Sequence, residues 1–335
     1  MGWGGLGCAV ARVDSRLVTL PAPPSATGGE IDRRGLAAGF GGYLWWGMLP
    51  LYFPLLAPAG PWEITAHRVL WSLLLCLLVL AMLGQLGRFW RLLRTTRVSA
   101  RLGLAAVLLS ANWVTFVLAV LTGHVVEASL GYYINPLVTA GMAVTILGER
   151  LRTAQWVAAG LGATGVVVIA VGNGTFPWIS LVLAGTFGGY GLVKKQVGEK
   201  VPALPGLGVE TLTLAPAALV LLVVLAVRGE GSFGGPGELF SSTGLALLLV
   251  GSGVLTTVPL VLFAAAARRL PLAMLGLLQY VTPTMQYLTG VFLYHEQMSA
   301  TRWAGFAVVW VALVVLSTDG YRATRTATPR PRRET

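Results

Sequence analysis

The sequence predicts an all-α membrane protein with ten transmembrane helices, arranged as two inverted five-helix repeats. Three observations support this fold class: 55% of the 335 residues are hydrophobic, only 11% are charged, and several short motifs recur at one constant spacing. A soluble domain carries about a quarter charged residues, so these charges are too few to cover a soluble surface. Apolar runs close to the ~20 residues that span a bilayer recur along the chain.

The ten expected helices are apolar runs bounded by Gly, Pro and charged residues. In the first half they span residues 36–56, 64–86, 102–122, 125–147 and 154–172. In the second half they span residues 177–193, 208–227, 243–267, 270–293 and 300–318. Residues 1–34 lack the continuous apolar core of a signal peptide and are expected to form a disordered tail. Residues 319–335 are expected to form a basic cytoplasmic tail.

The distribution of basic residues predicts the orientation. If both termini are cytoplasmic, 21 of the 24 Lys and Arg residues fall in cytoplasmic tails and loops, as positively charged segments generally do. This distribution also accounts for the net charge of +11, because basic loops are attracted to anionic lipid headgroups. No nucleic-acid partner is therefore inferred.

An internal repeat divides the expected helices into two halves. Phe40-Gly41-Gly42-Tyr43 recurs as Phe187-Gly188-Gly189-Tyr190, an offset of 147 residues that also relates Glu63 to Glu210, Pro136 to Pro283 and Glu149 to Glu296. The halves are expected at residues 36–172 and 177–318. Each contains an odd number of spans, so the second enters the membrane from the opposite side, the geometry of alternating access. A duplication retained only for stability is the alternative.

Catalytic and cofactor motifs give no support for an enzyme. The Gly160–Gly165 segment matches a dinucleotide fingerprint but lies inside an apolar span, so helix packing is the preferred interpretation. No Walker A, G-x-S-x-G or H-E-x-x-H motif occurs in the sequence. The two cysteines, Cys8 and Cys76, and the three histidines show no metal-site spacing. No cofactor or metal is expected.

Charged residues within spans are the best candidates for function, because burying them in lipid is costly. Glu63, His67 and Arg68 begin the second expected helix, with Glu63 and His67 on one face. Glu127 begins the fourth helix from the same side, so an ion pair between Arg68 and Glu127 is geometrically reasonable. Glu210 is the repeat counterpart of Glu63. Proton coupling through Glu63, Glu127 or Glu210 and structural anchoring at the interface both remain open.

A polar stripe predicts a cavity wall. Glu127, Gly131 and Asn135 share one face of the fourth helix before Pro136, and Gln279 holds a similar place before Pro283. Further polar and aromatic residues within the spans complete a possible central pocket. The candidate substrate-binding or gating residues are Tyr43, Glu63, His67, Arg68, Asn112, Glu127, Tyr132, Asn135, Tyr190, Glu210, Thr256 and Gln279.

Several segments carry a family resemblance: PWEITAHRVLWS at residues 61–72, EASLGYYINPL at 127–137, GERL at 148–151, ETLTLAP at 210–216, TTVPLVLF at 256–263 and LLQYVTPT at 277–284. In these the chain resembles the drug/metabolite transporter superfamily, in its EamA-type branch and most closely the RarD group. The resemblance implies ten helices, a pseudo-twofold axis in the membrane plane, a central cavity and a location in a bacterial inner membrane. His295 departs from the pattern, since relatives usually have Gly there.

These features lead to two functional hypotheses. The first is a secondary-active transporter of small organic solutes or drugs that works by alternating access. The second is a membrane scaffold or regulatory protein without transport activity, which would need no solvated cavity.

Overall fold

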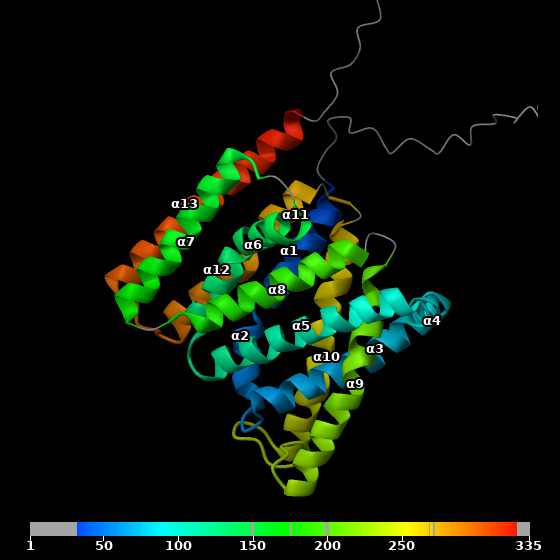
Figure 1. Ribbon diagram of the computed structural model, residues 1–335. Coiled ribbons are helices and arrows are strands. Elements are labelled where there is room, and N and C mark those ends of the chain that lie inside the picture. The colour runs from blue at the N-terminus through cyan, green and yellow to red at the C-terminus, as the bar shows by residue number, and fades with distance from the viewer. Residues whose placement is uncertain are drawn as a thin grey trace, which may run out of the picture. The chain divides into compact units, whose positions relative to one another are not determined.

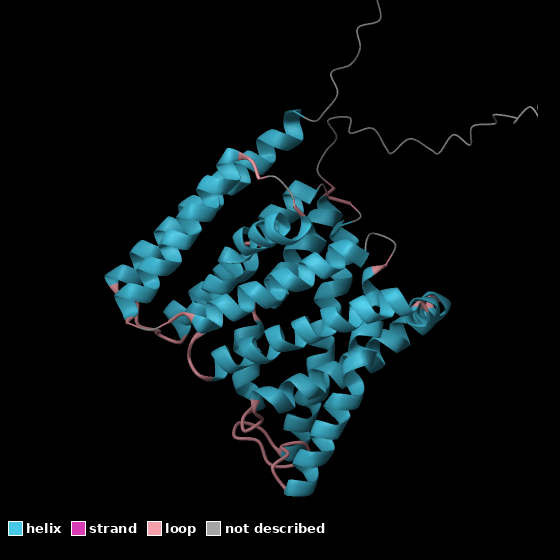
Figure 2. Ribbon diagram, in the orientation of Figure 1, coloured by secondary structure: helices cyan, strands magenta, loops and turns pink. Residues whose placement is uncertain are grey.

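The computed structural model describes residues 32–148, 151–174, 176–197, 201–267, 269–270 and 272–326. These residues form helices and loops, and the described part contains no strand (Figure 2). Most of the two expected tails lies outside the described residues, namely residues 1–31 and residues 327–335.

The helices of the first half begin with α1, Arg33–Gly47, which is followed by the short helix α2, Leu49–Tyr52, and the 3-10 helix η1, Phe53–Leu56. Next come α3, Pro61–Met82; α4, Leu86–Arg94; α5, Thr96–Leu121; α6, Val125–Leu147; and α7, Thr153–Asn173. The second half contains α8, Trp178–Val197; α9, Ala203–Arg228; α10, Ser242–Ala267; α11, Leu272–Leu278; α12, Val281–Leu288; the π-helix η2, Thr289–Leu293; and α13, Ala300–Thr326.

Six of the described helices are long and apolar enough to cross a membrane: α3, α5, α7, α9, α10 and α13. The expected spans at residues 36–56 and 270–293 are not continuous helices. Pro50 and Pro54 lack the N–H that a continuing helix needs, so the first expected span ends in two short pieces, α2 and η1, after the 15-residue α1. Pro283 has the same effect just after α11 ends at Leu278.

The boundary between the second and third expected spans was also wrong, because residues 86–94 form the amphipathic helix α4 instead of a loop. Phe89 on α4 is buried in a cluster with Leu80 of α3 and Val209 of α9. Arg88, Arg91 and Arg94 supply its basic side chains. The apolar face of α4 therefore packs on the bundle. In addition, α13 continues to Thr326, beyond the expected end at residue 318.

Helices at equivalent positions of the two halves pack antiparallel. Glu63 of α3 lines a pocket with Ala226 near the end of α9, whereas Leu80 near the end of α3 clusters with Val209 near the start of α9. Tyr133 of α6 is hydrogen-bonded to Thr284 of α12 at 2.8 Å, whereas Val126 near the start of α6 lies against Gly290 in η2, which follows α12. These two pairs of helices run side by side in opposite directions.

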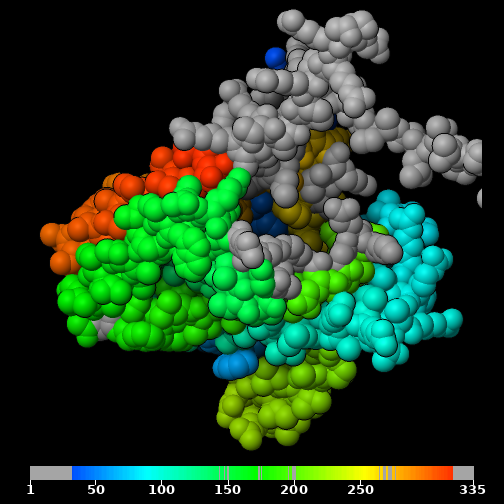
Figure 3. Space-filling model, turned by 45° about the horizontal axis from the view of Figure 1, so that its top comes forward, coloured from blue at the N-terminus to red at the C-terminus, as the bar shows by residue number. Residues whose placement is uncertain are grey.

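The third antiparallel pair is α7 and α13, which lie side by side in Figure 1 and present adjoining surfaces in Figure 3. A Cβ atom on Gly165 would lie 2.8 Å from the carbonyl oxygen of Gly305, and one on Gly305 would lie 2.8 Å from that of Gly165. The backbones approach this closely only because both residues are glycine. Gly165 of the Gly160–Gly165 motif thus serves helix packing, as the sequence interpretation predicts, whereas a Cβ on Gly160 would meet no atom within 4 Å.

The loop before α13 returns to the start of α6. His295 in this loop has φ +51°, the only non-glycine residue with positive φ in the described chain, and its repeat counterpart Gly148 has φ +68°. Both positions therefore require left-handed backbone, which glycine adopts without strain. Although His295 replaces the glycine of the family pattern, its backbone has the left-handed conformation that glycine favours.

Candidate functional site

A buried cation lies at the centre of the candidate site. Arg68 on α3 is 2% exposed, and its Nε donates a hydrogen bond to Thr256 Oγ1 of α10 at 3.2 Å. Its guanidinium carbon lies 4.5 Å from the ring centroid of Trp113 on α5 and 5.4 Å from that of Phe53 in η1. Three elements from both halves of the chain thus contact this one side chain of α3.

The expected ion pair between Arg68 and Glu127 is wrong. Among the described residues, no ion pair joins Arg68 to a carboxylate. Glu127 instead accepts a hydrogen bond from the N–H of Ile179 at 3.1 Å, and its backbone carbonyl accepts one from Ser180. These two hydrogen bonds connect the start of α6 to the start of α8.

The Arg68 charge is only partly compensated by its neighbours. Its Nη1 atom is buried and has no hydrogen-bond partner. A desolvated cation–π contact is worth about 2 kcal/mol, while burying an unpaired charge costs several kcal/mol. The aromatic rings and the single hydroxyl therefore leave the guanidinium short of an anionic partner.

A polar network extends from the same region. Tyr132 of α6 donates a hydrogen bond to Asn112 Oδ1 at 3.0 Å, and Asn112 Nδ2 donates to the carbonyl of Leu183 and to Thr186 Oγ1, both at 3.1 Å. These contacts tie α5, α6 and α8 together. Both N–H donors and the carbonyl oxygen of the Asn112 amide group have a partner, so this part of the network is structurally satisfied.

Aromatic rings connect Arg68 to a second charged group. Successive ring centroids are 5.7 to 6.0 Å apart along Phe53, Phe116, Tyr132, Phe187 and Tyr190. The hydroxyl of Tyr190 donates to Glu210 Oε2 at 3.4 Å. Glu210 is 1% exposed and forms an ion pair with Lys194 at 2.6 Å. An aromatic path thus joins the buried cation to an ion pair whose carboxylate is buried and whose lysine is partly exposed.

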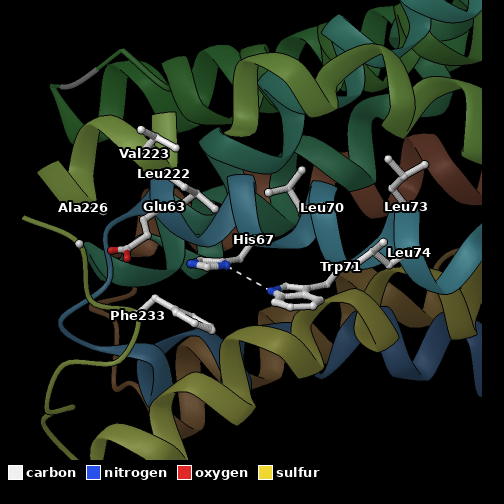
Figure 4. A pocket seen from close by; sticks show the side chains of 11 residues that line it. Glu63, His67, Leu70, Trp71, Leu73, Leu74, Leu222, Val223, Ala226 and Phe233 are labelled. Carbon is white, nitrogen blue, oxygen red and sulfur yellow. Dashed lines mark hydrogen bonds between the residues drawn. The ribbon is translucent and has the colours of Figure 1, made fainter. Parts of the chain in front are cut away.

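A pocket of about 580 Å³ lies between α3, α9 and the loop that follows α9 (Figure 4). His67 is stacked on Phe233 with ring centroids 5.1 Å apart, and its Nδ1 accepts a hydrogen bond from Trp71 Nε1 at 3.2 Å. Because the indole can only donate, the neutral imidazole carries its proton on Nε2. That atom is buried without a partner.

The other walls of the pocket are mostly apolar. Glu63 lies at one end, where its carboxylate accepts hydrogen bonds from Ser232 N at 2.6 Å and Ser232 Oγ at 2.9 Å. Leucine and valine side chains of α3 and α9 complete the lining, and Leu74 and Val223 at its rim are more than half exposed. The pocket therefore opens toward the outer surface of the bundle.

The candidate site residues predicted from the sequence do not form one cluster in the structure. Arg68 and Thr256 meet, Asn112 meets Tyr132, Glu63 lines the pocket with His67, and Tyr190 meets Glu210. The remaining candidates lie apart from these contacts. The carbonyl of Tyr43 accepts from Thr282, Asn135 accepts from Thr139, and Gln279 lies between α11 and α12. The functional role of each candidate stays a prediction.

Trp71, Phe233 and Lys194 were missed as site residues. Trp71 could have been found, because Glu63, His67 and Trp71 follow each other at four-residue spacing on one helix face. Phe233 belongs to the loop after α9, and its distance from His67 in the chain left no local signal. Lys194 was counted only as a cytoplasmic basic residue, whereas it pairs with Glu210.

Comparisons with known proteins agree with this architecture. The model of the EamA-like transporter family matches the chain twice, at residues 33–171 and 176–318. A protein named RarD from Streptomyces exfoliatus is 47% identical over 89% of this chain and 93% of its own length. An uncharacterized transporter of Pseudomonas aeruginosa is 44% identical, covering 88% of this chain and 96% of its own, and the RarD protein of Escherichia coli is 38% identical, covering 88% and 98%.

A solved crystal structure shares the fold. It aligns with a TM-score of 0.56 at 18% identity and covers 86% of this chain and 98% of the other. The apolar helices and the buried polar side chains between them, together with these relatives, define a multi-pass membrane protein of the transporter class. Within that class, the chain belongs to the EamA-like transporter family and to its RarD group.

Proposed function

We propose that the protein is a secondary-active transporter of small organic solutes in a bacterial inner membrane. In this proposal, residues 36–172 and 177–318 are two inverted five-helix repeats that exchange inward-open and outward-open arrangements. Both termini are cytoplasmic, as the positions of the Lys and Arg residues favour. The proposal takes residues 1–34 and 319–335 as tails that do not cross the membrane.

The observation that carries the proposal is the symmetry of the helix contacts. The packing of α5 on α8 corresponds to that of α10 on α1, and the packing of α6 on α8 corresponds to that of α12 on α1. Likewise, α10 on α3 corresponds to α5 on α9. Three further pairs each join a helix to its own repeat counterpart, so exchanging the halves only swaps the two partners. These are α3 with α9, α6 with α12 and α7 with α13. Exchanging the halves therefore maps these packing pairs onto one another, whereas α4 has no counterpart among the described helices of the second half.

The direction of the equivalent helices supports an inverted arrangement. An axis in the membrane plane reverses each helix relative to its counterpart. The antiparallel packing of α3 with α9 and of α6 with α12 is what such an axis requires. Because the two halves differ in sequence, two arrangements of unequal but similar energy are expected.

The polar interior supports solute transport over a purely structural role. Arg68, Asn112 and Glu210 are buried on helices of both halves, and Asn112 and Glu210 contact the partly buried Tyr132 and Lys194. Buried ionisable residues in membrane proteins commonly mark the paths of substrates or ions. In our proposal Glu63, Glu127 and Glu210 are the candidates for proton coupling, and Glu210 is the most deeply buried of them.

Transport is tested with the purified chain in liposomes. A broad metabolite mixture is placed outside, an imposed pH gradient drives uptake, and the contents are identified by mass spectrometry. Accumulation of a small organic solute above protein-free liposomes supports the proposal. Equal contents with and without the protein, in both orientations of the gradient, would overturn it.

Cysteine accessibility separates a transporter from a scaffold. Asn135→Cys and Gln279→Cys are made in a Cys8→Ser, Cys76→Ser background, with Val220→Cys as a control on the outer surface, because Val220 is 63% exposed and lies well inside the apolar helix α9. A water-filled cavity predicts labelling of the first two by a membrane-impermeant reagent. A scaffold without such a cavity predicts no labelling of either.

A further inference from the structure

We propose that Arg68 binds the anionic group of the substrate, so that the transported solutes are organic anions with an apolar or aromatic body. This inference rests on the proposed transport function and adds the class of solute. Its starting point is the buried Nη1 atom of Arg68, which has no hydrogen-bond partner in the described structure.

Among the described residues, the three acidic side chains singled out as candidates within the spans are engaged elsewhere. The Glu63 carboxylate accepts two hydrogen bonds from Ser232, and Glu210 pairs with Lys194. Glu127 accepts from the backbone of Ile179. A buried charge is normally paired, so a permanently cationic side chain without a counter-ion indicates that a ligand supplies it.

The groups around Arg68 suit a carboxylate on an apolar body. A guanidinium presents its N–H groups in a planar fork that matches a carboxylate in two parallel hydrogen bonds. Trp113 and Phe53 face the guanidinium, and Phe53 continues into the aromatic path through Phe116. A planar or aromatic body would therefore find ring surfaces next to the anion site.

The position of Arg68 also breaks the internal symmetry. The 147-residue offset relates Arg68 to Ala215, whereas Glu63 keeps its counterpart in Glu210. A cation needed only to hold the repeated fold would be expected in both halves. A single cation, present in one half only, instead suits a single bound solute that carries one anionic group.

The test compares carboxylates with their primary amides, which have nearly the same shape without the charge. Benzoate and benzamide, phenylacetate and phenylacetamide, indole-3-acetate and indole-3-acetamide, and hexanoate and hexanamide are used at constant ionic strength and neutral pH. Affinity is taken from the thermal stabilisation of the purified full-length protein, which a ligand of the folded state raises by mass action. Uptake of the same compounds into liposomes is measured in parallel.

We expect at least one acid to bind about tenfold or more tightly than its amide. Arg68→Gln should abolish this preference, and Arg68→Lys should keep part of it, because the charge remains while the planar fork is lost. Arg228→Gln is the matched control, since Arg228 is exposed at the end of α9. It should leave the preference unchanged.

Three outcomes separate this inference from the transport proposal. Uptake of neutral or cationic solutes with no preference for any acid would overturn the anion site and leave transport intact. Stabilisation by acids that depends on Arg68, without uptake of any solute, would uphold the anion site and overturn transport. An acid preference that survives in Arg68→Gln would overturn the assignment to Arg68. If Arg68→Gln does not fold, the proposal is tested by two other measurements. It is upheld if the wild type prefers an acid to its amide and Arg68→Lys reduces that preference, and it is overturned if the wild type shows no preference or Arg68→Lys leaves it unchanged.

Discussion

The carboxylate of Glu296 accepts a hydrogen bond from the backbone N–H of Val125 at 2.6 Å, and a further one from Val126 at 3.1 Å. The first N–H groups of a helix have no partner within it, and an anion near them also interacts favourably with the helix dipole. The loop before α13 thus caps α6, although the two are 171 residues apart in the chain.

Removal of this cap should destabilise the protein. Glu296→Gln keeps the shape of the side chain but loses the charge and one acceptor oxygen, so the free energy of unfolding should fall by about 1–2 kcal/mol. Thermal unfolding in detergent measures the change. Glu230→Gln, in the exposed loop after α9, is the control, and an equal shift in both variants would contradict the capping role.

Glycine at position 295 should stabilise the protein. Left-handed backbone costs an L-residue roughly 1–2 kcal/mol, and glycine loses about 0.5–1 kcal/mol through its greater freedom in the unfolded chain. With φ of +51° at His295, His295→Gly should therefore gain up to about 1 kcal/mol. His295→Val should lower stability, because a β-branched residue tolerates this conformation poorly. A gain in both variants, measured by thermal unfolding, would argue against backbone strain.

The glycines of the Gly160–Gly165 motif should respond differently to substitution. A side chain at Gly165 meets the backbone of Gly305 and the side chain of Val309, so Gly165→Val should cost about 1–3 kcal/mol through overpacking. A Cβ at Gly160 meets nothing within 4 Å, and Gly160→Ala should be neutral or favourable. Yield and thermal unfolding of the two variants check this. Loss of stability in both would indicate a role for the motif other than packing against α13.

The pair of Lys194 and Glu210 should depend on both partners. Lys194→Met leaves the 1% exposed Glu210 carboxylate without its counter-ion, which costs about 3 kcal/mol when one partner of a buried pair is removed. Lys194→Met with Glu210→Gln should recover a large part of this loss, since neither charge remains. A double-mutant cycle on unfolding midpoints measures the coupling. Additive effects would show that the two side chains do not interact.

The sequence by itself determined that the chain is a membrane protein of helices, where most of them lie, and that two similar halves follow each other. These features are local, because hydropathy over about 20 residues and a constant offset need no knowledge of packing. The same local signals missed α4, which is short and basic, and the breaks near Pro50 and Tyr280 within apolar runs. Apolarity alone does not show where a helix stops.

Only the tertiary structure decided the partners of the polar residues. Glu63, Arg68 and Glu127 lie near helix ends that hydropathy places on one side of the membrane, so an ion pair between two of them was a reasonable expectation. Ser232, Thr256 and Ile179 are the partners instead, and each comes from the second half of the chain. Which side chains meet depends on the rotation and crossing of helices from both halves, and no local pattern records that geometry.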